Sequence, residues 1–115
     1  MARIKPIHLT SGSQPGRWIV ISEYRYRGVT VEAGFVTDLD SVPRIPGIYS
    51  RVKGRTVVAA VIHDWCYRKL VKNDKMTRKA ADKLFLRAMK DEGVNLIHRR
   101  IIYRAVRMFG GAAIK

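Results

Sequence analysis

Short runs of β-forming residues occupy much of the first half of the chain. Residues 17–26 alternate in part between polar and apolar positions and are rich in Trp, Val and Tyr. Arg27-Gly28 interrupts this pattern, and Val29-Thr30-Val31 resumes it. Two such runs around a glycine-containing interruption are typical of a β-hairpin. We therefore predict a hairpin with Gly28 in its turn, preceded by a Ser/Gly/Pro-rich loop at residues 11–16.

The segment 34–54 is punctuated by glycine and proline rather than by a regular apolar pattern. Gly34, Pro43, Pro46, Gly47 and Gly54 all fall within it. Residues of this kind favour turns and interrupt helices and strands. The segment is predicted to be an ordered loop with a short strand at Phe35-Val36.

Helical spacing of apolar residues begins at residue 56. A first helix is predicted over 56–70, broken at Asn73 and Asp74, and a second runs from the N-cap Thr77 to about Glu92, where Gly93 stops it. The apolar positions of the first helix are Val57, Val58, Val61, Ile62 and Trp65. Those of the second are Ala81, Leu84, Phe85 and Ala88, which follow the 3, 4, 7 spacing.

A third helix is predicted from Asn95, as its cap, to Gly110-Gly111. Its expected core side consists of Ile101, Ile102, Ala105, Met108 and Phe109. Another side carries a basic stripe of Arg100, Arg104 and Arg107. That stripe fits either a solvated helix face or a binding surface.

The order of these elements predicts an α+β fold, with an N-terminal β-hairpin or small antiparallel sheet followed by a three-helix half. The length of 115 residues fits one domain, β-rich over 1–50 and helical over 54–110. The longest apolar run, residues 57–62, is too short to cross a bilayer. The first residues contain no continuous apolar stretch, so no signal peptide is expected. The single cysteine, Cys66, cannot form an internal disulfide, which suits a host cytoplasm or a virion assembled there.

A large excess of positive charge narrows the range of partners. Lys and Arg number 23 against 9 acidic residues, for a net charge of +14. Such an excess favours polyanions, namely nucleic acid, an anionic membrane or an acidic protein subunit. Charge alone does not choose among them, and a generally basic, soluble surface without a specific partner is the alternative.

His63 is the most informative polar residue of the predicted first helix. Ala59 and Ala60 share its helical face, so another helix backbone can approach closely there. The short connection to the second helix favours antiparallel packing of the two helices. That helix offers Asp82, on a face with Phe85 and Met89, where an unpaired carboxylate would be costly.

We therefore predict that His63 and Asp82 form a dyad across the two helices, with the Tyr67 hydroxyl available to Asp82. A carboxylate on one imidazole nitrogen fixes the tautomer and raises the basicity of the other nitrogen. Such a base can take a proton from water. The alternative is a structural hydrogen bond that only ties two helices together.

Three aspartates are candidates for binding a hard cation. Asp64 points about 100° away from His63 around the helix, towards the preceding loop. Asp38 and Asp40 lie in that loop, flanked by Thr37 and Ser41. Calcium takes six to eight oxygen ligands, of the kind that such a loop supplies. Thr, Asp and Ser also make local turns and caps, so a purely structural role for the loop stays open.

Several segments spread along the chain are jointly specific. They are Gly34-Phe35-Val36-Thr37-Asp38, Ser41-Val42-Pro43-Arg44, Ala59-Ala60-Val61-Ile62-His63-Asp64 with Tyr67, Ala81-Asp82 with Phe85 and Met89, and Tyr103 with Val106-Arg107 and Phe109-Gly110. Together they resemble a family of tailed phages and prophages known as domain of unknown function 1353, over about residues 17–110. The resemblance implies a phage origin and no established activity.

A second resemblance concerns the residues around His63. His63-Asp64-Trp65-Cys66-Tyr67, followed by Ala81-Asp82, is similar to the active-site helices of phospholipase A2 enzymes. By position, this resemblance implies His63 as the base that activates water, Asp64 as a calcium ligand and Asp82 as the residue that orients His63, supported by Tyr67. The glycine-rich calcium loop and the disulfides of the secreted enzymes are not recognisable here.

Three hypotheses about function follow. The first is a metal-assisted hydrolase, acting on phospholipid esters at the virion or lysis stage, with calcium as the expected cation. The second is a non-enzymatic virion, tail or assembly component, in which the same residues form a structural network and the charge faces nucleic acid or another phage structural protein. The third is a small inhibitor directed at the host. The sequence does not determine the oligomeric state.

Overall fold

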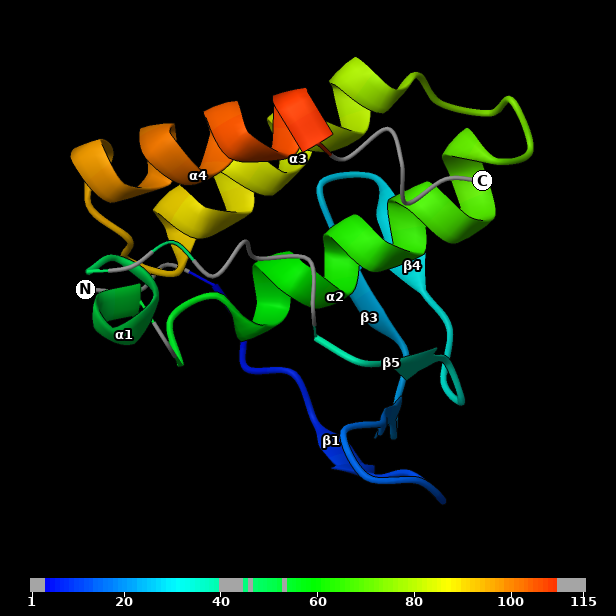
Figure 1. Ribbon diagram of the computed structural model, residues 1–115. Coiled ribbons are helices and arrows are strands. Elements are labelled where there is room, and N and C mark those ends of the chain that lie inside the picture. The colour runs from blue at the N-terminus through cyan, green and yellow to red at the C-terminus, as the bar shows by residue number, and fades with distance from the viewer. Residues whose placement is uncertain (1–3, 40–44, 46, 53, 110–115) are drawn as a thin grey trace.

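The fold was obtained as a computed structural model that describes residues 4–39, 45, 47–52 and 54–109 (Figure 1). Short antiparallel strands come first and helices follow, which confirms the predicted α+β fold class. The strands of the described residues form two small antiparallel sheets. The first, in the order β1-β2-β5, contains β1 (Leu9–Ser11), β2 (Trp18–Val20) and β5 (Val36–Thr37). The second is the hairpin of β3 (Tyr24–Tyr26) and β4 (Val29–Val31).

The predicted hairpin is correct at its turn and wrong in the length of its first arm. Tyr26 pairs with Val29, and the two turn residues Arg27 and Gly28 have φ values of 44° and 85°. Positive φ at both positions is what a two-residue hairpin turn of type I′ requires, and glycine adopts it without a steric penalty. The run 17–26 does not form one strand, because it leaves the first sheet after Val20 and enters the second at Tyr24. Alternation alone does not show where a chain changes sheets.

The strand expected at Phe35-Val36 is present one residue later, at Val36–Thr37. Phe35 is instead a buried residue that packs edge-on against Trp65, with ring centroids 5.0 Å apart. The rest of the predicted loop includes a short helix, α1 (Tyr49–Val52), that the sequence pattern did not indicate. Residues 40–44, 46 and 53 of this segment lie outside the described part of the chain.

The second and third long helices begin where their predicted caps lie. α3 spans Arg78–Asp91, and its N-cap Thr77 accepts a hydrogen bond from the backbone of Ala80 at 3.0 Å. α4 spans Leu96–Phe109, and the Asn95 side chain accepts from the backbone of His98 at 2.8 Å. Both caps satisfy amide groups that have no partner within the helix.

The last part of the first helical segment is a π-helix, which the sequence pattern did not predict. α2 covers Val57–Trp65, and the chain then continues as a π-helix, η1 (Cys66–Val71), with the amide of Lys72 bonded to the carbonyl of Tyr67. Isolated π-turns within a helix occur frequently at functional sites. Here the widened turn contains Tyr67, one of the predicted site residues.

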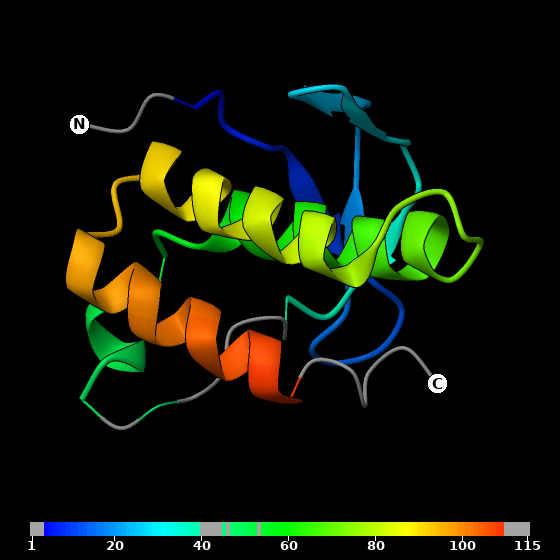
Figure 2. The same cartoon turned by 90° about the horizontal axis from the view of Figure 1, so that it is seen from above.

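α3 packs against both α2 and α4, and the hairpin lies against α2 (Figures 1 and 2). A single cluster of buried side chains joins these parts; its fully buried members include Val20, Val31, Ile62, Phe85, Met89 and Ile102. The predicted core side of α4 is partly wrong, because Ile101 is 38% exposed and Met108 is 75% exposed. Ile102 is buried as predicted, and Val106, which was not predicted, is buried with it. The helix is therefore rotated relative to the prediction, and the side chain of Phe109 lies outside the described part.

Within the described residues, no helix combines the length and apolar character that crossing a membrane would require.

Candidate functional site

His63 and Asp82 meet between α2 and α3, as predicted. His63 Nε2 lies 2.7 Å from Asp82 Oδ1. The close approach is possible because Ala59 and Ala60 on α2 and Ala81 on α3 are small and almost completely buried. Small side chains at a helix interface let two backbones come together, and the polar pair then bridges them. The contact itself is confirmed.

Asp82 is the centre of the network. The carboxylate is fully buried and accepts a hydrogen bond from the Tyr67 hydroxyl on the same oxygen that contacts His63. Its second oxygen accepts from Arg107 Nη1 at 2.7 Å, with Arg78 Nη1 at 3.6 Å. Burial by itself would raise the pKa of Asp82, but the hydrogen bonds from His63, Tyr67 and Arg107 outweigh burial and hold the pKa below its usual value. Asp82 is therefore ionised around neutral pH.

Arg107 was not predicted as a site residue. It was placed in a surface stripe of α4, whereas its guanidinium reaches Asp82 and its backbone carbonyl accepts from Arg78 Nη2 at 3.2 Å. The sequence offers one signal that would have found it: a buried carboxylate expects a cation, and α4 is the next helix along the chain.

Aromatic rings hold the imidazole in place. Phe85 stacks on His63, with centroids 4.5 Å apart and planes 25° apart, and the Tyr67 ring lies 4.1 Å away. Burial and the hydrogen bond to Asp82 raise the pKa of Tyr67, so that its hydroxyl stays protonated and donates. His63 as a whole is 4% exposed.

The second ring nitrogen of His63, Nδ1, is the atom of chemical interest. The hydrogen bond to Asp82 is made through Nε2, and no side chain of the described residues is hydrogen-bonded to Nδ1. No completely buried side-chain nitrogen or oxygen of the described residues lacks a partner. Together these facts place Nδ1 at the small part of the ring that reaches the surface.

Asp64 lies on another side of α2, where the helix faces β5. Its carboxylate is 3.4 Å from Arg68 Nη1, and the buried Thr37 hydroxyl also hydrogen-bonds to it. Burial raises the pKa of the Asp64 carboxyl; the Thr37 hydrogen bond and the Arg68 charge oppose that change, and the negative charge of Asp38 adds to it. The structure therefore brings Asp38 and Asp64 near each other, as the predicted cation site requires.

The described residues do not complete a calcium site. Asp38 is also 3.4 Å from Arg17 Nη1, so both carboxylates already face a guanidinium group. No group of three or more acidic, His or Cys side chains within the described residues is arranged to hold a metal ion. Calcium takes six to eight oxygens, which two carboxylates and one hydroxyl do not supply. Asp40, the third predicted ligand, lies outside the described residues, and calcium binding stays a prediction.

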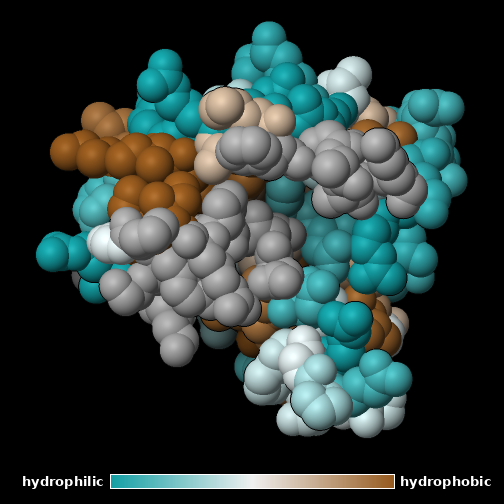
Figure 3. Space-filling view, viewed as in Figure 1, coloured by the Kyte–Doolittle hydropathy of each residue, from teal (hydrophilic) through white to brown (hydrophobic). Residues whose placement is uncertain are grey.

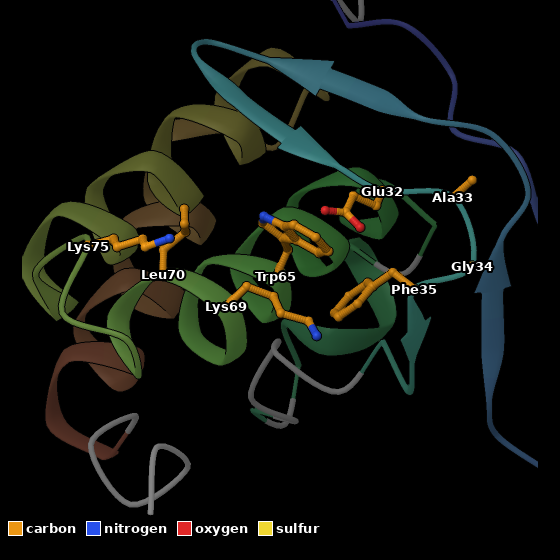
Figure 4. Close-up of a pocket in the computed structure, with 8 residues that line it drawn as sticks. All are labelled: Glu32, Ala33, Gly34, Phe35, Trp65, Lys69, Leu70 and Lys75. Atoms are coloured by element: carbon orange, nitrogen blue, oxygen red, sulfur yellow. The ribbon is translucent and has the colours of Figure 1, made fainter.

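A cavity of about 450 Å³ lies beside the C-terminal end of α2 (Figure 4). Phe35, Trp65, Lys69 and Lys75 are among the residues that line it. Trp65 is two positions after His63, which places the two side chains about 200° apart around a helix. This cavity is therefore not an entrance to His63.

Cys66 is fully buried in the core, and burial raises the pKa of its thiol to about 12. The thiol is thus protonated at neutral pH and is not a nucleophile there.

Comparison with known proteins identifies a family but no individual relative. No curated protein and no solved structure matches the chain. The family model described as "Protein of unknown function (DUF1353)" matches residues 18–106, a span that contains β2 to most of α4 and every residue of the His63–Asp82 network except Arg107. The chain therefore belongs to the DUF1353 family of proteins of unknown function.

Proposed function

We propose that this protein is a phage hydrolase in which His63 is the general base that activates water for attack on an ester. The observation that carries the proposal is the 2.7 Å contact between His63 Nε2 and the buried Asp82 carboxylate, with Nδ1 left without a protein partner among the described residues. The phage context rests on the sequence resemblance described above.

In the proposed reaction, a water molecule gives its proton to Nδ1 while its oxygen attacks the carbonyl carbon of the ester. The resulting imidazolium keeps its Nε2 proton in the hydrogen bond to Asp82, whose negative charge stabilises the new positive charge. Nδ1 then returns a proton to the departing alcohol as the carbon–oxygen bond breaks. General-base assistance of this kind is worth roughly 10²–10⁴ in rate.

Arg107 modifies the part that Asp82 plays. A carboxylate already paired with a guanidinium at 2.7 Å exerts a weaker pull on the imidazole proton than an unpaired one does. Asp82 therefore acts mainly by fixing the ring and its tautomer, with Tyr67 and Phe85 limiting rotation of the imidazole. It is a positioning residue rather than a proton acceptor.

Calcium enters the proposal as a prediction about Asp64. The neighbouring carboxylate of Asp38 and the Thr37 hydroxyl would contribute hard oxygen donors of the type that calcium prefers. A bound cation there would polarise the ester carbonyl. If the proposal holds in this form, activity will rise with added calcium and fall with a chelator, and Asp64→Asn will lose that response.

A non-enzymatic role is the second candidate, and two observations favour it. His63 is only 4% exposed, and Asp82 is neutralised by two arginines from different helices. A polar network with such partners can serve to fix the packing of α2, α3 and α4 without any chemistry. In a virion or assembly component, the role of the His63–Asp82 network would be to fix this packing.

The discriminating experiment is ester hydrolysis by the whole protein and by His63→Gln. We would follow p-nitrophenyl butyrate and a fluorescent phosphatidylglycerol, with calcium and with EDTA. Glutamine keeps an N–H that can donate to Asp82 but has no base at the Nδ1 position. We expect a folded variant with activity reduced at least 100-fold, in line with general-base catalysis. His8→Gln, at an exposed histidine, serves as the matched control.

Two results would overturn the hydrolase proposal. One is a wild-type protein that hydrolyses neither ester under either metal condition. The other is a His63→Gln variant that retains wild-type activity. In both cases the non-enzymatic candidate stands, and it predicts that His63→Ala lowers the melting temperature markedly while His8→Ala does not.

A further inference from the structure

The outward side of α4 exposes large aliphatic side chains to solvent. Ile97 is 70% exposed, Met108 75% and Ile101 38%. Positions 97, 101 and 108 are four and seven residues apart, so they follow one line along a helix. Figure 3 shows hydrophobic surface over the N-terminal part of α4. Isolated exposed apolar residues are ordinary, whereas apolar side chains grouped on one face and bordered by polar ones are typical of an interaction site.

Two arginines run beside this apolar row. Arg100 and Arg104 are exposed, and within the described residues neither is paired with a carboxylate. The other two arginines of α4 are engaged elsewhere: Arg99 donates to the carbonyl of Val94 at 3.1 Å, and Arg107 binds Asp82. No acidic residue occurs in α4. We call the surface of Ile97, Arg100, Ile101, Arg104 and Met108 the outer face of α4.

We propose that the outer face of α4 binds the surface of an anionic phospholipid bilayer. The helix would lie in the plane of the interface, with its aliphatic row among the acyl chains and Arg100 and Arg104 at the phosphates. Interfacial helices have this combination of an apolar row and a basic flank, with the apolar side buried about 5–10 Å deep. Each arginine near an anionic surface contributes about fivefold in affinity.

The combination of apolar and basic side chains on the outer face of α4 favours an anionic lipid surface over the other polyanions that the net charge of +14 would attract. Nucleic acid would satisfy Arg100 and Arg104 but offers no apolar medium for Ile97 and Met108. Packing of two copies through this face would bring the two arginine rows together without any carboxylate between them. A bilayer meets both needs, since it is deformable, apolar within and negatively charged at its surface.

This inference does not depend on the proposed hydrolysis, because no residue of the outer face of α4 belongs to the His63–Asp82 network. Arg107, which contacts Asp82, lies about 100° around the helix from Met108 of the aliphatic row. Where both proposals hold, the ester substrate is a phospholipid of the membrane to which α4 binds.

The test is flotation of the purified protein with vesicles of phosphatidylcholine alone and of phosphatidylcholine with 30% phosphatidylglycerol. Wild type is expected to float with the anionic vesicles and to stay behind with the neutral ones. Ile97→Ser should lower the partition coefficient about tenfold or more, because the inserted isoleucine side chain no longer leaves water. The double variant R100Q/R104Q should lower it by more than tenfold. Ile21→Ser, at another isoleucine that is 56% exposed, is the control and should bind as wild type does.

Three outcomes would overturn the proposal. The first is a wild type that does not float with anionic vesicles. The second is a binding constant for anionic vesicles that Ile97→Ser leaves unchanged. The third is a wild-type dimer in sedimentation velocity that Ile97→Ser converts to a monomer, which would assign the outer face of α4 to a second copy. A catalytically inactive protein that still floats, and loses flotation through Ile97→Ser, would support this inference while the hydrolase proposal fails.

Discussion

At the scale of single residues, the buried carboxylate of Asp82 connects three helices. It is fully buried, and four side chains from α2, η1, α3 and α4 are directed at its two oxygens. An ionised carboxylate in that place is tolerated because each oxygen receives charged or strongly polar donors. Removing its charge would leave arginines without a counter-ion at the junction of three helices.

We predict that Asp82→Asn lowers the free energy of unfolding by about 3 kcal/mol, the cost typical of breaking a buried ion pair. The asparagine amide also presents N–H groups to Arg107, which can only donate. Urea denaturation followed by circular dichroism measures the change. Glu23→Gln removes an exposed ion pair with Arg25 at 3.0 Å and should cost less than about 1 kcal/mol. Equal effects of the two substitutions would contradict the role given to Asp82.

At the scale of elements, the start of α2 depends on a residue from the end of α3. Thr56 precedes α2 but makes no side-chain capping bond. The Glu92 carboxylate takes that place, accepting from the amides of Val58 and Ala59 at 3.0 and 2.7 Å. Burial raises the pKa of Glu92 from 4.5 to about 7, although those two backbone hydrogen bonds act in the opposite direction. The cap that joins two helices is therefore also a titrating group.

This cap predicts a pH dependence of stability. The folded protein binds the Glu92 proton more tightly than the unfolded chain does, so this contribution is complete below pH 4.5 and is lost as pH rises through about 7. The full loss is about 3 kcal/mol for a shift of this size. Asp82, whose pKa is lowered, has the opposite effect on stability. Its stabilisation is complete above its usual pKa of 3.8 and is lost as pH falls through the lower pKa of the folded protein.

Glu92→Gln should therefore flatten the profile of unfolding free energy between pH 5 and 7.5 and be more stable than wild type at the upper end. Thermal denaturation across that range is the measurement. A variant whose profile runs parallel to that of wild type would show that another group causes the pH dependence.

At the scale of the whole molecule, a few long-range contacts join the strands to the helices. The Tyr26 hydroxyl of the hairpin donates to Asp91 Oδ2 at the end of α3 at 2.6 Å, across 65 positions of sequence. Arg27 and Arg87 also approach that carboxylate, at 3.4 and 3.7 Å. Burial and the bond to Asp91 raise the pKa of Tyr26, so the phenol remains a donor at any ordinary pH.

Tyr26→Phe is expected to lower the free energy of unfolding by about 1.5–3 kcal/mol, as for a hydrogen bond to a charged acceptor. Tyr24→Phe, in the same strand, removes a bond from its hydroxyl to the backbone carbonyl of Lys5 at 2.7 Å. That neutral bond should be worth about 0.5–1.5 kcal/mol. Chemical denaturation of the two variants gives both values, and a larger loss for Tyr24→Phe would refute the importance assigned to Asp91.

The features predicted correctly from the sequence share one property, which is that neighbours in the chain decide them. The Gly28 turn, the Thr77 and Asn95 caps and the stop at Gly93 each need only a few adjacent residues. The His63–Asp82 contact was predictable because a short connection forces α2 and α3 side by side and a buried carboxylate needs a partner.

The sequence by itself thus determined the α+β class, the turn and cap positions and the dyad between neighbouring helices. The tertiary structure decided the split of residues 17–26 between two sheets, the rotation of α4 and the pairing of Arg107 with Asp82. It also decided that Glu92 caps α2. The contact of Arg107 with Asp82 and that of Glu92 with Ala59 join groups 25 and 33 positions apart, which meet only when the whole chain packs. The split of residues 17–26 depends on pairing of β2 with β1 and β5 rather than with β4, and no local pattern encodes which partner each strand finds.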